Sequence, residues 1–220
     1  MANFYFQQYA FIWTYLDTRS VLHNNCTYFS NCLSHGCHCF PGTKSFRQVG
    51  GKGPSMDSID GVCKQQFQCH RCLKIDSGCD ADKTGYRAKF IGKRRSVTRD
   101  VSCHKNREGT CARQLCECDK HMAYSMKSVW NDTLHDNFYW LDKRNKKQNQ
   151  VFEYENTCIR KQNGNNANAN KCCGNWPKVI PFNDDNRACC VGTDVTSKPR
   201  IFDDGTHECC DGRLTQIGEC

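Results

Sequence analysis

Cysteine constrains this chain more than any other residue: twenty cysteines are spread over 220 residues, and three pairs of them are adjacent in the sequence. A content of about 9% is typical of a domain held by disulfides, and disulfides persist in oxidising compartments. An even number allows every thiol to pair, although spacing alone does not determine the connectivity. We therefore expect a secreted, extracellular, disulfide-rich protein.

Zinc binding is the alternative use of so much cysteine. A CxxC motif occurs only at Cys69 and Cys72, and no matching second pair accompanies it. His35 and His38 lie beside Cys37 and Cys39, where exposed imidazoles next to disulfides are expected rather than metal ligands. The sequence therefore predicts no metal and no cofactor.

The amino-terminal segment is apolar but does not have the pattern of a signal peptide. No Lys or Arg precedes Arg19, and no small-residue cleavage site follows. We expect that a signal was removed before residue 1. No run of eighteen apolar residues predicts a transmembrane helix.

Two cysteine-rich segments are expected to form a pair of cross-linked helices. The first is DSIDGVCKQQFQCHRC, at 57–72, within a helix predicted from Asp57 to Leu73. The second is TCARQLCECDKHMAY, at 110–124, within a helix predicted from Cys111 to Asn131. The side chains at positions 65–68, between Cys63 and Cys69, are Gln65, Gln66, Phe67 and Gln68, and none of them can take a proton at neutral pH.

These segments resemble the secreted phospholipase A2 family, whose helix signatures are D-x-x-x-C-C-x-x-H-D-x-C and C-E-C-D. Asp57 to Cys69 corresponds to the first signature, and Cys116-Glu117-Cys118-Asp119 matches the second. The segments 50–53 and 85–103 are similar to the family's glycine-rich segment and two-stranded wing. The resemblance extends over residues 1–158 and implies a helical platform with a small β-wing.

The same resemblance implies that catalysis has been lost. The family's catalytic histidine falls on Gln66 and its calcium-binding aspartate on Phe67, whereas Asp119, which would orient the histidine, is retained. Gln66 is expected to satisfy Asp119 by hydrogen bonding. His70 is expected to be an isolated structural group farther along the helix. No catalytic residue is predicted.

Other departures from the family lie in the calcium loop and in one disulfide. The loop appears as HGCHC, at 35–39, followed by Phe40-Pro41 and an insertion before Gly50. One disulfide is absent at both of its ends, which fall on Val62 and Ser125. The loss of both partners together supports the alignment.

The resemblance also implies five disulfides: Cys39 with Cys63, Cys69 with Cys118, Cys79 with Cys111, Cys103 with Cys116, and Cys37 with Cys158. Ten cysteines remain, namely Cys26, Cys32, Cys72 and seven in the carboxy-terminal tail. Because seven is odd, full oxidation requires at least one bond from the tail to the main domain or to another chain.

The remaining main-domain segments leave two questions open. Apolar residues Tyr5, Tyr9, Ile12 and Leu16 predict a helix over 3–17, whose additional aromatic side chains either complete the core or dock on another molecule. The formal charge is +8, with basic clusters at 93–95 and 143–147. These clusters are either solvated surface or a site for acidic lipid, polysaccharide or protein. No nucleic-acid motif accompanies them.

The tail, 172–220, contains a repeat. Cysteine doublets occur at 172–173, 189–190 and 209–210, and Phe182-Asn183-Asp184 and Phe202-Asp203-Asp204 each precede a doublet by the same interval. Adjacent cysteines bond to each other only through a strained ring, so each doublet should reach two partners. The tail resembles the di-cysteine repeats of galaxin-like matrix proteins. The Asn-rich segment 159–171 is expected to be a linker.

The predicted fold class is mainly α and disulfide-rich, with a small β-wing and an irregular or β carboxy-terminal module. The first functional hypothesis is a non-catalytic extracellular structural protein, related to otoconin-like inactive family members. It would assemble with itself or with matrix components into a biomineral-associated or byssus-like material, and polysaccharide, mineral or lipid surfaces are further partners. The alternatives are a membrane-perturbing or receptor-binding inactive toxin and a surviving lipid hydrolase. Asn25 and Asn131 begin glycosylation sequons.

Overall fold

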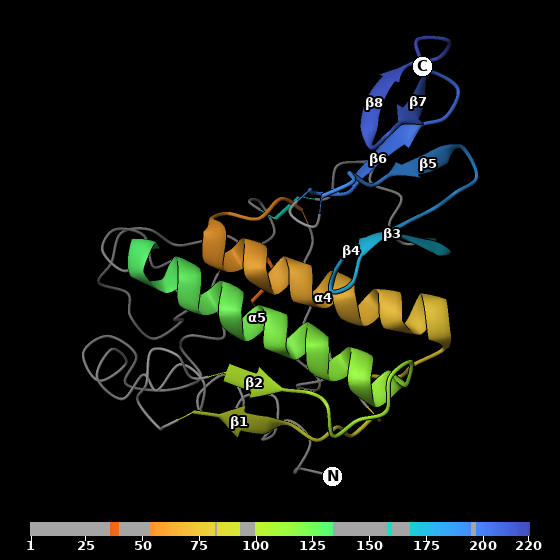
Figure 1. Cartoon of the computed structure of the whole chain (residues 1–220). Coiled ribbons are helices and arrows are strands. Elements are labelled where there is room, and N and C mark those ends of the chain that lie inside the picture. The colour runs from red at the N-terminus through yellow and green to blue at the C-terminus, as the bar shows by residue number, and fades with distance from the viewer. Residues whose placement is uncertain are drawn as a thin grey trace.

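The computed structural model describes residues 36–39, 53–81, 83–92, 100–133, 158–159, 168–194 and 197–220. Two helices and four antiparallel strand pairs account for its regular structure (Figure 1). The mainly α prediction is therefore only partly correct, because strand pairs accompany both helices in this part of the chain. The helix predicted over 3–17 lies outside the described residues. No described helix is long and apolar enough to cross a bilayer.

Helix α4, Ser58–Ser77, begins and ends at defined caps. The Asp57 side chain accepts a hydrogen bond from the Asp60 amide at 2.8 Å, which satisfies one free donor of the first turn. Gly78 ends the helix with φ 64°, a left-handed conformation that glycine adopts without a Cβ clash. The helix is one turn longer at its carboxyl end than the sequence pattern predicted.

Helix α5, Cys111–Thr133, runs antiparallel to α4 and forms the second half of the platform (Figure 1). The Cys69–Cys118 disulfide joins the two helices near their middle. Toward the amino-terminal end of α4, Ile59 and Val62 pack with Met122 and Met126 of α5. The platform predicted from the cysteine spacing is thus also held by an apolar interface.

The wing is a two-stranded antiparallel sheet. Strand β1, Lys89–Ile91, pairs with β2, Asp100–Ser102, with Phe90 opposite Val101. Val101 is buried against Ala123 of α5, so the wing packs on this helix. Residues 93–99, including the basic cluster 93–95 and most of the second strand predicted at 97–101, lie outside the described residues.

The tail forms three hairpins in succession. They pair β3 with β4 (Lys171–Asn175, Lys178–Phe182), β5 with β6 (Arg187–Cys190, Arg200–Asp203), and β7 with β8 (His207–Cys210, Arg213–Gln216). The β3–β4 hairpin packs directly on α4, where Val179 is buried among Cys69, Cys72 and Leu73. The other two hairpins extend away from the helices (Figure 1).

Nine disulfides connect the described cysteines, and none of these cysteines is free. Five of the bonds join the pairs that the family resemblance implies: Cys37–Cys158, Cys39–Cys63, Cys69–Cys118, Cys79–Cys111 and Cys103–Cys116. The other four are Cys72–Cys172, Cys173–Cys189, Cys190–Cys209 and Cys210–Cys220. Cys72–Cys172 joins the tail to the main domain, which is one of the two outcomes that the odd cysteine count allowed. Cys26 and Cys32 lie outside the described residues.

Candidate functional site

Asp119 of α5 is the centre of a buried polar network between the helices. Its side chain is fully buried, and its two oxygens accept hydrogen bonds from three residues. Oδ1 accepts from Gln66 Nε2 at 2.8 Å and lies 3.0 Å from His70 Nε2, while Oδ2 accepts from Tyr86 Oη at 2.7 Å. Three neighbours therefore compensate the desolvation of this carboxylate.

The helix geometry explains why Gln66 and His70 meet at the same oxygen. They are four residues apart on α4, so they occupy the same face of the helix. The Cys69–Cys118 disulfide keeps this face against α5. The hydrogen bond expected between Gln66 and Asp119 is present.

His70 is not the isolated group that was expected, because it contacts Asp119. The four-residue spacing between His70 and Gln66 could have indicated this contact, since side chains on that face of α4 are directed toward the opposing helix. The side chain of His70 is 20% exposed. It is therefore partly accessible, in contrast to the carboxylate it contacts.

The side chains around Asp119 offer mainly hydrogen bonds and apolar surface. The Gln66 amide can donate and accept hydrogen bonds but cannot take a proton at neutral pH. Burial and the Asp119 charge raise the pKa of Tyr86, so its hydroxyl stays a neutral donor. Phe67, the next residue on α4, is partly buried and offers no oxygen to a calcium ion. His70 is the one titratable nitrogen that the described residues place on this carboxylate.

A second buried carboxylate, Asp60, fixes the segment 36–39 against α4. It accepts hydrogen bonds from the backbone amides of Cys37, His38 and Met56 at 2.9, 2.6 and 2.9 Å. A Cβ on Gly36 would lie 2.3 Å from the Asp60 carboxyl carbon, so this position requires glycine. The Asp60 carboxylate thus fixes the backbone at these three amides, which is a structural role.

His38 is buried, which corrects the expectation of an exposed imidazole. Its Nε2 lies 3.1 Å from the Gly53 carbonyl oxygen, to which it donates, and its Nδ1 has no partner. Burial lowers the pKa of His38, with a smaller contribution in the same direction from Lys64 and an opposing one from Asp60. The folded state therefore favours the neutral ring.

Acid is expected to destabilise the protein through His38. The unfolded chain binds the proton near the ordinary pKa of about 6.5, above the lowered pKa of the folded state. The contribution of His38 is therefore fully present above that pH and is lost as the pH falls toward the folded-state pKa. Urea unfolding at pH 7.5 and pH 5.0 should show a smaller drop in the midpoint for His38→Gln than for the wild type. An equal drop in the two proteins would contradict this assignment.

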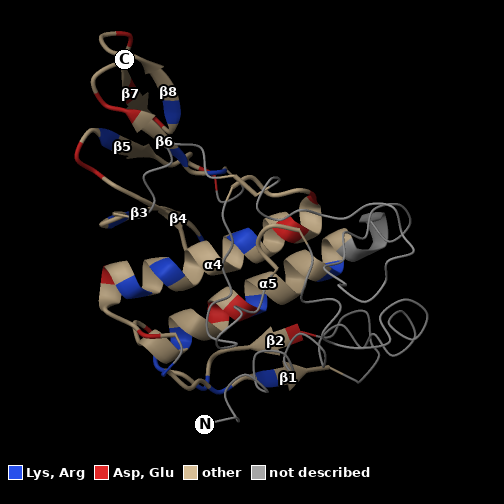
Figure 2. Ribbon diagram, turned by 180° about the vertical axis from the view of Figure 1, so that it is seen from behind, with Lys and Arg blue, Asp and Glu red and all other residues tan. Residues whose placement is uncertain are grey.

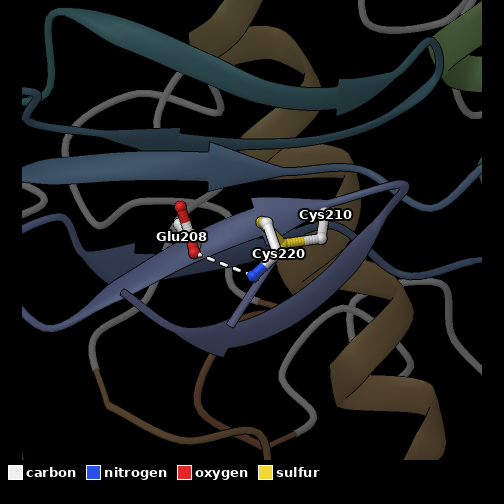
Figure 3. A group of neighbouring side chains, drawn as sticks. All are labelled: Glu208, Cys210 and Cys220. Atoms are coloured by element: carbon white, nitrogen blue, oxygen red, sulfur yellow. Dashed lines mark hydrogen bonds between the residues drawn. A yellow bond between two sulfur atoms is a disulfide. The ribbon is translucent and has the colours of Figure 1, made fainter. Parts of the chain in front are cut away.

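Within the described part of the chain, one group of side chains could offer ligands to a metal: Glu208, Cys210 and Cys220 in the tail (Figure 3). The two sulfurs are bonded to each other, and a metal needs the thiolate. Glu208 Oε1 accepts hydrogen bonds from the amides of Gly218 at 2.8 Å and Cys220 at 3.2 Å. The carboxylate thus closes the last turn of the chain, which is a structural role.

Basic side chains are distributed over the helices rather than gathered at the buried network. Figure 2 shows Lys and Arg at intervals along α4 and α5, and Asp and Glu both on these helices and in the tail. Lys74 and Lys127 are exposed on α4 and α5, respectively. These two lysine side chains therefore reach solvent on the platform.

Comparison with known proteins gives relatives but no match to a family profile. Mouse group IID secretory phospholipase A2 is 32% identical over 116 residues, which are 51% of this chain and 67% of the mouse protein. Guinea-pig (Cavia porcellus) membrane-associated phospholipase A2 is 36% identical over 91 residues, 41% of this chain and 52% of the relative.

A third relative is the basic phospholipase A2 homolog myotoxin II of Bothrops moojeni. It is 30% identical over 93 residues, which are 42% of this chain and 61% of the relative. The chain thus spans 52–67% of the length of these three relatives.

Proposed function

This chain belongs to the secreted phospholipase A2 family, and we propose that it is a non-catalytic, secreted member with a structural role outside the cell. One observation carries the proposal: the group that contacts the buried carboxylate of Asp119 from position 66 is an amide, at 2.8 Å. By the family resemblance, a histidine base belongs at that position and a calcium-binding aspartate at Phe67. Without base and cation, neither water activation nor oxyanion stabilisation is available.

The structural part of the proposal rests on the covalent frame. Each disulfide that closes a long loop contributes roughly 2–4 kcal/mol, so the platform remains rigid without calcium. The tail adds three hairpins joined by cysteine doublets, a pattern similar to galaxin-like matrix proteins. A rigid helical platform with a disulfide-linked tail as its arm (residues 172–220) is suited to scaffolding a matrix or fibre. Its partners would be other copies of the chain or matrix components.

The catalytic part is tested by calcium-dependent fatty-acid release from phospholipid vesicles. Loss of the base alone lowers the rate by about 10²–10⁴, so the wild type should remain at background next to an active secreted relative. Gln66→Ala and His70→Ala should leave that background unchanged. Hydrolysis at a rate typical of active relatives, reduced by either substitution, would refute the proposal and would assign the chemistry to this network.

The assembly part is tested on the intact, oxidised protein. We expect light scattering and electron microscopy to show filaments or sheets that grow with protein concentration. A reductant opens the disulfides of both the platform and the tail, so we expect its addition to stop the growth. A strictly monomeric protein at all concentrations, with or without calcium, would contradict a self-assembling role.

Membrane perturbation is the second candidate, and the relation to a basic myotoxin homolog favours it. The net charge of +8 would attract the protein to anionic bilayers. Calcium-independent release of dye from anionic vesicles, and none from neutral vesicles, would support this candidate. Absence of release at low salt would exclude it.

A further inference from the structure

The disulfides of the tail form one continuous covalent path from α4 to Cys220. The path enters the tail through Cys72–Cys172, continues through Cys173–Cys189 and Cys190–Cys209, and ends with Cys210–Cys220. Consecutive bonds are separated by a single peptide unit, because each doublet supplies one cysteine to the bond before it and one to the bond after it. The hairpin backbones are side branches of this path.

We propose that this path carries tension and makes the arm, residues 172–220, inextensible. We call the path the strut. Force applied between α4 and the chain end follows the shortest covalent connection. The disulfide Cα–Cα distances are 5.8, 5.4, 5.4 and 5.7 Å, and neighbouring Cα atoms are about 3.8 Å apart, so the whole path measures roughly 34 Å. The three arm bonds bypass loops with sequence separations of 16, 19 and 10 residues.

The strut explains why two-stranded hairpins suffice in this arm. An isolated two-stranded hairpin is marginally stable in water, and each tail sheet has two strands. Under tension such hairpins would unravel one after another if the backbone carried the load. Here the load bypasses them, so the arm keeps its length even when a hairpin opens.

The inner end of the strut is anchored in the platform core. Cys72 is fully buried, and Val179 of β4 packs beside it. Three residues earlier on α4, Cys69 is bonded to Cys118 of α5. Force arriving through Cys172 is therefore passed to both helices rather than to one helix surface.

Single-molecule force spectroscopy on the full, oxidised chain tests the strut. One handle is placed at Lys74, which is exposed on α4 two residues after Cys72, and the other follows Cys220. The wild type should show no lengthening step of hairpin size. Reductant should release steps of about 50, 60 and 30 Å from the three arm bonds, in proportion to their loop lengths. Opening of Cys72–Cys172, whose sequence separation is 100, should add one larger step.

Two variants keep the test specific. Cys190→Ser/Cys209→Ser should add one step of about 60 Å in oxidising buffer, because only that loop enters the load path. Cys173→Ser/Cys189→Ser should add one of about 50 Å and gives an independent measurement should the first variant fail to fold. Cys103→Ser/Cys116→Ser removes a disulfide outside the path and should add none.

A hairpin-sized step in the oxidised wild type, or no step in either arm variant, would overturn the strut. The physiological use of the strut rests on the proposed structural role, but its inextensibility is measured on the isolated protein. A lipid-cleaving protein with an inextensible arm would refute the proposed function alone. An extensible arm on an inactive protein would refute the strut alone.

Discussion

Truncation after Asn170 should destabilise the helical platform by about 5 kcal/mol, although every residue removed lies beyond the segment that resembles the phospholipases. The truncated chain, with Cys72→Ala to avoid a free thiol, loses a disulfide worth roughly 2–4 kcal/mol. It also loses the burial of Val179, worth about 1.5–3 kcal/mol, against Leu73 and Leu115. Urea unfolding followed by far-ultraviolet circular dichroism measures the difference.

A second truncation, which removes fewer residues, provides the matched control. A chain ending at Asn186 and carrying Cys173→Ser keeps β3, β4 and Cys72–Cys172, and loses only the two outer hairpins. Its stability should differ from that of the full chain by less than about 1 kcal/mol. Equal stability of the two truncated chains would show that β3–β4 is a separate module and that the boundary lies near residue 171.

Asp119→Ala should cost about 3–5 kcal/mol, because it removes the shared acceptor of the buried network. The Gln66 amide is almost completely buried and would lose its 2.8 Å hydrogen bond. The Tyr86 hydroxyl would lose its partner at 2.7 Å. Each buried polar group left without a partner contributes about 1–3 kcal/mol, which the midpoint of urea unfolding reports.

Asp119→Asn separates the loss of hydrogen bonds from the loss of charge. The amide oxygen can still accept from Gln66 and His70, and the amide nitrogen can donate to the Tyr86 oxygen. The expected cost is therefore about 1 kcal/mol. A loss as large as that of Asp119→Ala would mean that the negative charge, rather than the acceptor atoms, stabilises this site.

Local rules predicted much of the platform from the sequence. The spacing of Cys63 and Cys69 placed them on α4, and the C-E-C-D segment was expected on the facing helix, as found. The hydrogen bond between Gln66 and Asp119 could be predicted because the resemblance aligned the two helices. The cap at Asp57 was also predictable, since it depends on residues within one turn.

Other features could not be read from local patterns. The partner of His70 depends on the orientation of α5 relative to α4, and the burial of His38 depends on Asp60, a residue 22 positions away. The contact of the β3–β4 hairpin with α4 could not be predicted, because it depends on the pairing of Cys172 with a residue 100 positions away. A doublet shows that two partners exist, but it does not show which ones.

The sequence by itself determined the number of cysteines, the position of the doublets, the odd number of cysteines in the tail, and the absence at positions 65–68 of a side chain that can take a proton at neutral pH. Those properties depend on residue identity alone. Only the tertiary structure decided that Cys72 receives Cys172, that Val179 completes a core formed by both helices, and that the tail disulfides join end to end. The physical reason is that disulfide formation and apolar burial require close approach in space, which the packing of distant segments decides.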